Sequence, residues 1–146
     1  MARIRIDLPD TFLFQRDFRV PAELVNSAEH MGGEHMLAIA IETKGEFIKS
    51  LGYNGSLDVE GLGLIMADTG VVYFAESDLD DLLRIDVGLS NIANKSAEFI
   101  YRVTNVTKGC EAARVKFGIL FFDYKAKKAE AIPASFLEKI AANAGA

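Results

Sequence analysis

A cluster of polar residues and glycines near residue 30 holds the groups best suited to chemistry. It contains Asn26, His30, Gly32, Gly33, Glu34 and His35. The apolar run 36–41 follows at once and predicts a helix that begins at Gly33 or Glu34. Unpaired backbone N–H groups and the positive end of the helix dipole face outward at such a start, where they favour an anion or an oxyanion. The spacing therefore predicts chemistry at a helix amino terminus.

The two glycines and the two strongest polar candidates each have a plainer interpretation. Gly32 and Gly33 could only form a tight turn, but exposed N–H groups there could stabilise an oxyanion by about 3–4 kcal/mol per donor. Asn26 could be a turn residue that hydrogen-bonds its own backbone. His30 could satisfy loop hydrogen bonds, although a histidine beside glycines at a helix start is a better functional candidate than one on an apolar face.

Two glutamates on the predicted helix are candidate bases. Glu34 is the stronger one, and its plainer role is a favourable charge at a helix amino terminus, worth roughly 0.3–1 kcal/mol. Glu42 lies eight residues later on the same helix face, where it could face a substrate pocket or pair with a lysine or arginine. His35 is expected to be a packing or interface residue.

The elements around this cluster follow from hydrophobic periodicity. The helix should reach Leu51, with Gly52 as a left-handed stop, and its first half is apolar on nearly every face, which predicts burial all round. An extended segment precedes it at 12–25. Strands should follow at 64–66 and 71–75, flanking turn residues 68–70, and then at 83–89, 98–103 and 113–122, before a short helix at 134–142. This order predicts an α+β fold with an antiparallel sheet.

Composition limits the possible classes of function. The 146 residues are expected to form a single domain, 1–146, with half of the residues hydrophobic and a quarter charged. The net charge of −5 makes nonspecific nucleic-acid binding an unlikely function, since no basic stripe is present. No apolar run approaches the roughly 20 residues that span a bilayer, and the alternating amino terminus does not resemble a signal peptide. Cys110 stands alone, so we expect a cytoplasmic protein without disulfides.

The order of elements and polar residues resembles the hotdog fold, and within it the acyl-CoA thioesterases of the 4-hydroxybenzoyl-CoA thioesterase-like type. The matching pieces are His30–Gly33, Glu42, Phe47–Gly52, Asp81–Ile85, Lys95–Tyr101 and Lys127–Phe136. The resemblance implies an antiparallel sheet wrapped around a long central helix. It also implies hydrolysis of an acyl-CoA thioester to a free carboxylic acid and coenzyme A, with no metal or organic cofactor beyond the coenzyme A of the substrate.

The chain departs from this family at the usual catalytic aspartate. That aspartate stands four residues before the histidine, where this chain has Asn26, and an amide cannot accept a proton at neutral pH. One branch of the superfamily carries asparagine there with a His-Leu-Gly-Asn-Asp-like run, which the run 30–34 resembles, with Glu34 at the acidic position. The resemblance then implies that Asn26 and His30 hold the thioester and water, that Glu34 or else Glu42 is the general base, and that Gly32 or Gly33 binds the oxyanion.

Two other functions remain open. A non-catalytic module that binds an acyl group or acyl-CoA is the first alternative, because the usual aspartate is missing. A hotdog dehydratase or hydratase is weaker, since its Asn-Pro or His-Phe-Pro loop is absent. Basic candidates for the coenzyme A phosphates are Lys95, Arg102, Lys108 and Arg114.

Self-association is also expected. A curled sheet leaves an edge strand and an apolar face that need cover, which predicts a homodimer, or a tetramer as is common for the family. The strand at 113–122 turns apolar on both faces towards its end, so it should be central in the sheet or covered by a partner subunit.

Overall fold

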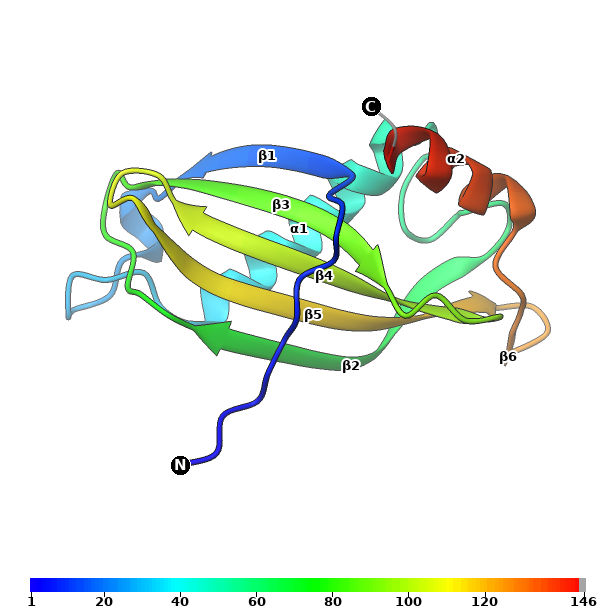
Figure 1. Ribbon diagram of the computed structural model, residues 1–146, viewed down its shortest axis with the longest axis horizontal. Helices are drawn as coiled ribbons and strands as arrows, with labels where there is room; N and C mark the ends of the chain where they lie inside the picture. Colours follow the sequence, from blue (N-terminus) through cyan, green and yellow to red (C-terminus); the bar gives the residue numbers. More distant parts are fainter. Residues whose placement is uncertain (145–146) are drawn as a thin grey trace.

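One antiparallel sheet with a helix against one face forms the body of the protein (Figure 1). The computed structural model describes residues 1–144. Within them the elements are β1 (Phe14–Arg19), the 3₁₀ turn η1 (Ala22–Leu24), α1 (Glu34–Ser50), β2 (Gly63–Tyr73), β3 (Leu82–Ser90), β4 (Ser96–Asn105), β5 (Cys110–Asp123), β6 (Lys128–Ala129) and α2 (Ala134–Ala144). The strand order is β1-β3-β4-β5-β2, with β6 paired to β5. The α+β class is confirmed, and β5 is central as expected. Neither helix in residues 1–144 is long and apolar enough to cross a membrane.

The core lies between α1 and the sheet. Phe47 of α1 packs edge-on against Phe99 of β4, with ring centroids 6.0 Å apart, and both side chains are fully buried. Burying an aromatic side chain of this size contributes about 1.5–3 kcal/mol, so this layer fixes where α1 lies on the sheet. α1 ends as expected, with Gly52 at a φ of 98°.

The expectation that α1 is buried on every side is wrong for the single chain. Its buried residues form one face, whereas Ala38 is exposed and Ile41 keeps 43% of its surface exposed. α1 has 17 residues and packs against β3 and β5, and Phe47 also contacts Phe14 of β1 and Phe99 of β4, but a long central helix is not confirmed. The apolar run extends beyond the face that one curled sheet can cover, which leaves apolar helix surface without cover.

β2 corrects a second expectation, because the residues assigned to a turn lie inside one continuous strand. The register with β5 shifts between Met66 and Asp68, which marks a β-bulge. There the Asp68 carboxylate accepts a hydrogen bond from the Gly118 backbone N–H at 3.1 Å and another from the Lys116 ammonium at 2.9 Å. Residues that form turns also occur at β-bulges, so residues 68–70 mark a bulge in this strand and not a turn between two strands.

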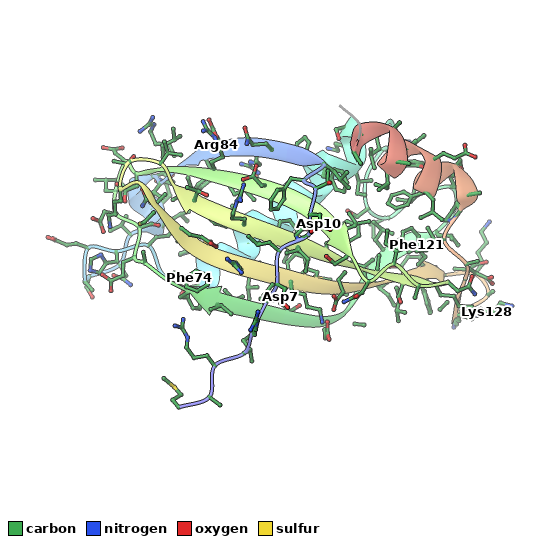
Figure 2. The ribbon with its side chains drawn as sticks, viewed as in Figure 1. Asp7, Asp10, Phe74, Arg84, Phe121 and Lys128 are labelled. Carbon is green, nitrogen blue, oxygen red and sulfur yellow. The ribbon has the colours of Figure 1, made fainter. Side chains whose placement is uncertain are left out.

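The amino-terminal arm, residues 1–13, crosses the face of the sheet opposite α1 (Figure 1). Figure 2 shows Asp7 and Asp10 of this arm lying in front of the strands. Ile6 packs there with Val72 and Ile100 in a small second cluster. The Arg3 guanidinium donates to the Tyr73 carbonyl oxygen at 2.6 Å, so the arm braces the end of β2.

Gly88 gives the first prediction, because the arm passes directly over it. A Cβ at Gly88 would lie 2.6 Å from Pro9 Cγ and 2.7 Å from the Thr11 carbonyl oxygen. Gly88→Ala should therefore lower the free energy of unfolding by about 1–3 kcal/mol and expose the arm to protease. Gly55→Ala is the matched control, since nothing lies within 4 Å of its added Cβ. Denaturant unfolding that gives equal stabilities for the two variants would contradict this packing.

The uncovered edge of the sheet gives the second prediction, a homodimer. β2 is an edge strand, and Met66 and Tyr73 on its α1 side keep 42% and 45% of their surfaces exposed. Ile41 on α1 is a third exposed apolar side chain, and a second copy can cover such residues. Light scattering should show a dimer or tetramer, and Ile41→Glu with Met66→Glu should dissociate it. Leu57→Glu, at a loop residue with 75% exposure, should not. A stable wild-type monomer at micromolar concentration rules the dimer out.

Candidate functional site

Backbone hydrogen bonds fold residues 24–32 into a tight loop. The Asn26 N–H donates to the His30 carbonyl oxygen at 2.9 Å, and the Glu29 N–H donates to the Asn26 carbonyl oxygen at 2.9 Å. Glu29 takes a φ of 67° to close the turn. The Asn26 side-chain oxygen accepts from the Ala28 N–H at 3.0 Å, so Asn26 is a turn residue. Its side-chain amide nitrogen has no hydrogen-bond partner within residues 1–144.

The helix that follows begins without a side-chain cap. The N-cap residue is Gly33, which has no side chain that could accept a hydrogen bond from the first turn. Across the described part of the chain, the N–H groups of Gly33 and Glu34 have no acceptor, whereas the Gly32 N–H donates to the Leu24 carbonyl oxygen at 3.2 Å. Of the two glycines predicted as oxyanion donors, Gly33 is therefore the one with an available N–H.

A cavity of about 460 Å³ opens beside this helix start, a size typical of small-molecule sites. Its lining includes four of the predicted site residues, Asn26, His30, Gly32 and Gly33. The far wall is the end of β2 and the loop after it, residues 73–77, where Figure 2 labels Phe74. Met31 and Met36 add apolar surface, so the cavity combines an apolar wall with a polar edge.

His30 lies between two carboxylates. Its Nδ1 is 2.8 Å from Asp78 Oδ1 and its Nε2 is 2.9 Å from Glu76 Oε2. Lys108 Nζ lies 3.0 Å from the second oxygen of Asp78. Hydrogen bonds from His30 and then Lys108 lower the pKa of the Asp78 carboxyl from its ordinary value, so Asp78 is ionised at neutral pH.

Sequence reasoning missed Glu76 and Asp78, which lie on the loop between β2 and β3. Figure 1 shows this loop at the same end of the sheet as the loop before α1. The Met31 N–H donates to the Ser77 carbonyl oxygen at 2.7 Å, which ties the two loops together. Buried Asn105 donates to Asp81 Oδ2 at 2.8 Å, and the same oxygen accepts from the Asp78 N–H at 2.9 Å. The acidic run 76–81 was the only available signal, and it did not indicate which carboxylates face His30.

Glu34 follows directly after the cavity residue Gly33 but does not itself line the cavity. Its carboxylate folds back over Gly32, so that a Cβ there would lie 2.5 Å from Glu34 Oε1. Tyr73, which lines the cavity, donates its hydroxyl to the Gly33 carbonyl oxygen at 2.8 Å. Burial, and secondarily the charge of Glu34, raises the pKa of Tyr73. The Glu34 charge therefore acts on the cavity, although its side chain is largely exposed.

Glu42 and His35 lie outside the cavity. Glu42 Oε1 is 3.4 Å from a terminal nitrogen of Arg16 on β1, while Glu46 lies 3.3 Å from Arg16 Nε. Of the two roles expected for Glu42, facing a substrate pocket or pairing with a basic residue, the single chain therefore shows the pairing. His35 is half-buried beside Glu34, with its Nε2 3.5 Å from Glu34 Oε1.

The four basic candidates for coenzyme A are spread over the molecule. Lys108 lies beside the His30 site, and Arg114 stacks on Phe74 with its guanidinium carbon 5.5 Å from the ring centroid. Arg102 pairs with Asp86 on the opposite face of the sheet from α1. Lys95 borders the other end of β5, where its carbonyl oxygen accepts from the Phe121 N–H. Within residues 1–144 no three His, Cys, Asp or Glu side chains are placed to share a metal ion.

Solved structures share this fold. A 1,4-dihydroxy-2-naphthoyl-CoA thioesterase from Synechocystis has a TM-score of 0.78 at 14% identity, covering 90% of this chain and 96% of its own. A Staphylococcus aureus protein solved in complex with CoA has a TM-score of 0.82 at 18% identity, covering 96% and 89%. A gentisyl-coenzyme A thioesterase has a TM-score of 0.74 at 17% identity, covering 85% and 99%. At these identities the likeness establishes the fold alone.

A comparison with curated protein sequences finds no match. The family model described as the thioesterase-like superfamily matches residues 20–140, which include α1, the strands β2 to β6 and the whole cavity lining. The chain therefore belongs to the thioesterase-like superfamily.

Proposed function

We propose that this protein hydrolyses an acyl-CoA thioester to a free carboxylic acid and coenzyme A. The observation that carries the proposal is the uncapped amino end of α1, whose free N–H groups stand beside a cavity that also contains His30. Membership of the thioesterase-like superfamily supports the reaction class. The CoA complex of the Staphylococcus aureus protein supports coenzyme A as the leaving group.

The Gly33 N–H supplies the oxyanion site in this proposal. Attack of water on the thioester carbon places a negative charge on the carbonyl oxygen, and the positive end of the α1 dipole stabilises that charge. The cavity wall formed by Met31, Met36 and Phe74 accommodates the acyl group. A donor in such a site is worth about 10²–10³ in kcat.

Glu34 is the proposed general base, and Asn26 the residue that holds water. The free amide nitrogen of Asn26 donates a hydrogen bond and cannot accept a proton, so the base must be another group. Glu34 is an exposed carboxylate next to the oxyanion donors, whereas Glu42 is engaged with Arg16. The alternative, a non-catalytic acyl-CoA binding module, rests on Asn26. The ionisable cluster at His30 favours an enzyme, because a binding module has no need of one.

The third prediction tests the base. With a panel of acyl-CoA substrates and free-thiol detection, the wild type should turn over at least one of them. Glu34→Gln should lower kcat by about 10²-fold or more without unfolding the protein. Glu42→Gln, on the same helix but paired with Arg16, is the matched control and should stay within a few-fold of wild type. An exchange of the two effects would identify Glu42 as the base. If both variants turn over at the wild-type rate, the active site does not lie at this helix start. If the wild type binds acyl-CoA but releases no thiol, the protein is the binding module.

The fourth prediction concerns Asn26. Asn26→Asp keeps the oxygen that accepts from Ala28, but it removes the amide donor and adds charge to a cavity that already contains Glu76. We expect kcat/KM to fall by about tenfold or more, and Asn26→Ala to cost less than loss of the base. Increased turnover in Asn26→Asp would mean that the usual family carboxylate still fits here and that the assigned role of Asn26 is incorrect.

A further inference from the structure

The contacts of His30 lead to an inference that rests on the proposed function and goes further. We propose that Glu76 and Asp78 hold His30 as an imidazolium, and that His30 is the general acid that protonates the departing sulfur of coenzyme A. Water attack with Glu34 as base then has a complementary proton donor for the leaving group.

The double protonation follows from two short contacts of the ring, a hydrogen bond between Nδ1 and Asp78 and a close approach of Nε2 to Glu76. An ionised carboxylate only accepts hydrogen bonds, and a neutral imidazole has a single N–H. Both ring nitrogens of His30 lie within 2.9 Å of a carboxylate oxygen, so both must donate for neither contact to be repulsive. A charged donor and a charged acceptor also give the stronger class of hydrogen bond.

The two carboxylates are not equivalent. Asp78 is held by His30 and Lys108, and its backbone N–H donates to Asp81. Glu76 makes its one side-chain contact within residues 1–144 with His30, and its side chain is 69% exposed. Asp78 therefore fixes the ring as a positioning residue. Glu76 Oε2 lies 2.9 Å from Nε2, and this exposed side chain can move aside for a substrate in the cavity, which both His30 and Glu76 line.

The proposed step balances in protons and electrons. As the water oxygen bonds to the thioester carbon, Glu34 takes one water proton and the carbonyl electron pair moves onto oxygen. When that pair returns, the carbon–sulfur bond breaks with its electrons on sulfur, and His30 Nε2 gives its proton to sulfur. The carboxylic acid product ionises, and the proton on Glu34 passes through water to His30. Hydrolysis thus yields carboxylate, coenzyme A thiol and one released proton.

Leaving-group dependence tests the acid role. An ordinary thiol has a pKa of about 8.5, so departure as a thiolate at neutral pH is assisted by a proton donor. A more acidic aryl thiol, such as 4-nitrothiophenol, needs no such assistance. His30→Gln should lower kcat about 10²-fold with an acyl-CoA but less than tenfold with the 4-nitrothiophenyl thioester of the same acid. Glu34→Gln, the matched control, should lower both about equally. Equal losses in His30→Gln would overturn the general-acid role.

Nitrogen NMR tests the clamp independently of turnover. The chain has two histidines, so a ¹⁵N-labelled His35→Gln protein reports His30 alone. Its spectra at neutral pH should show protons on both ring nitrogens. Glu76→Gln in the same background should lower the doubly protonated fraction and leave the Nδ1–H tautomer facing Asp78. Asp78→Asn should lower kcat more than it changes KM and should mix the two tautomers.

A single neutral tautomer in the His35→Gln protein would overturn the proposal. A wild type inactive on every acyl-CoA would refute the proposed function and the acid role together, while the spectra would still decide whether the clamp exists.

Discussion

The packing of α1 against the sheet determines where every part of the candidate site lies. Phe47 and its neighbours press one face of the helix onto β3 and β5, which leaves the first turn at the open end of the sheet. The N–H groups of Gly33 and Glu34 have no acceptor within residues 1–144, so they remain available to an incoming anion. A side-chain cap at position 33 would accept from the N–H groups of His35 and Met36, which already donate to the Gly32 and Gly33 carbonyl oxygens.

The distribution of negative charge around the cavity explains how this chain accommodates Asn26. The carboxylates next to His30 come from the loop after β2, and Glu34 adds a third at the helix start. Lys108 offsets part of this charge, which lets Glu76 and Asp78 lie close to one histidine. The amide at Asn26 then serves the turn and leaves its nitrogen free. The carboxylates that face His30 therefore come from the loop after β2 and not from position 26.

Much of the fold was predictable from the sequence because local periodicity determines it. The ends of α1, the alternating strands β3 to β5 and the carboxyl-terminal helix follow directly from apolar spacing and from Gly52. The continuous β2 was not predictable, because residues 68–70 fit a turn as well as a bulge and only pairing with β5 decides between them. The exposed side of α1 was missed for a similar reason, since an apolar run does not say how many faces the sheet covers.

The site was predictable only where its residues are neighbours in sequence. Asn26, His30 and Gly33 meet in the cavity because one short loop carries them. Glu76 and Asp78 reach His30 across 46 and 48 residues of chain, through loop contacts that sequence patterns do not encode. The use of the Gly32 N–H by Leu24 likewise depends on how the loop closes.

A structure with a carba analogue of acyl-CoA, in which a methylene replaces the thioester sulfur, tests the central claim most directly. We expect the ketone oxygen to accept a hydrogen bond from the Gly33 N–H. The acyl group should then lie against Met36 and Phe74, and the methylene should lie within reach of His30 Nε2 after Glu76 has moved aside. An analogue bound outside this cavity, or with its ketone oxygen turned away from the amino end of α1, would contradict the account.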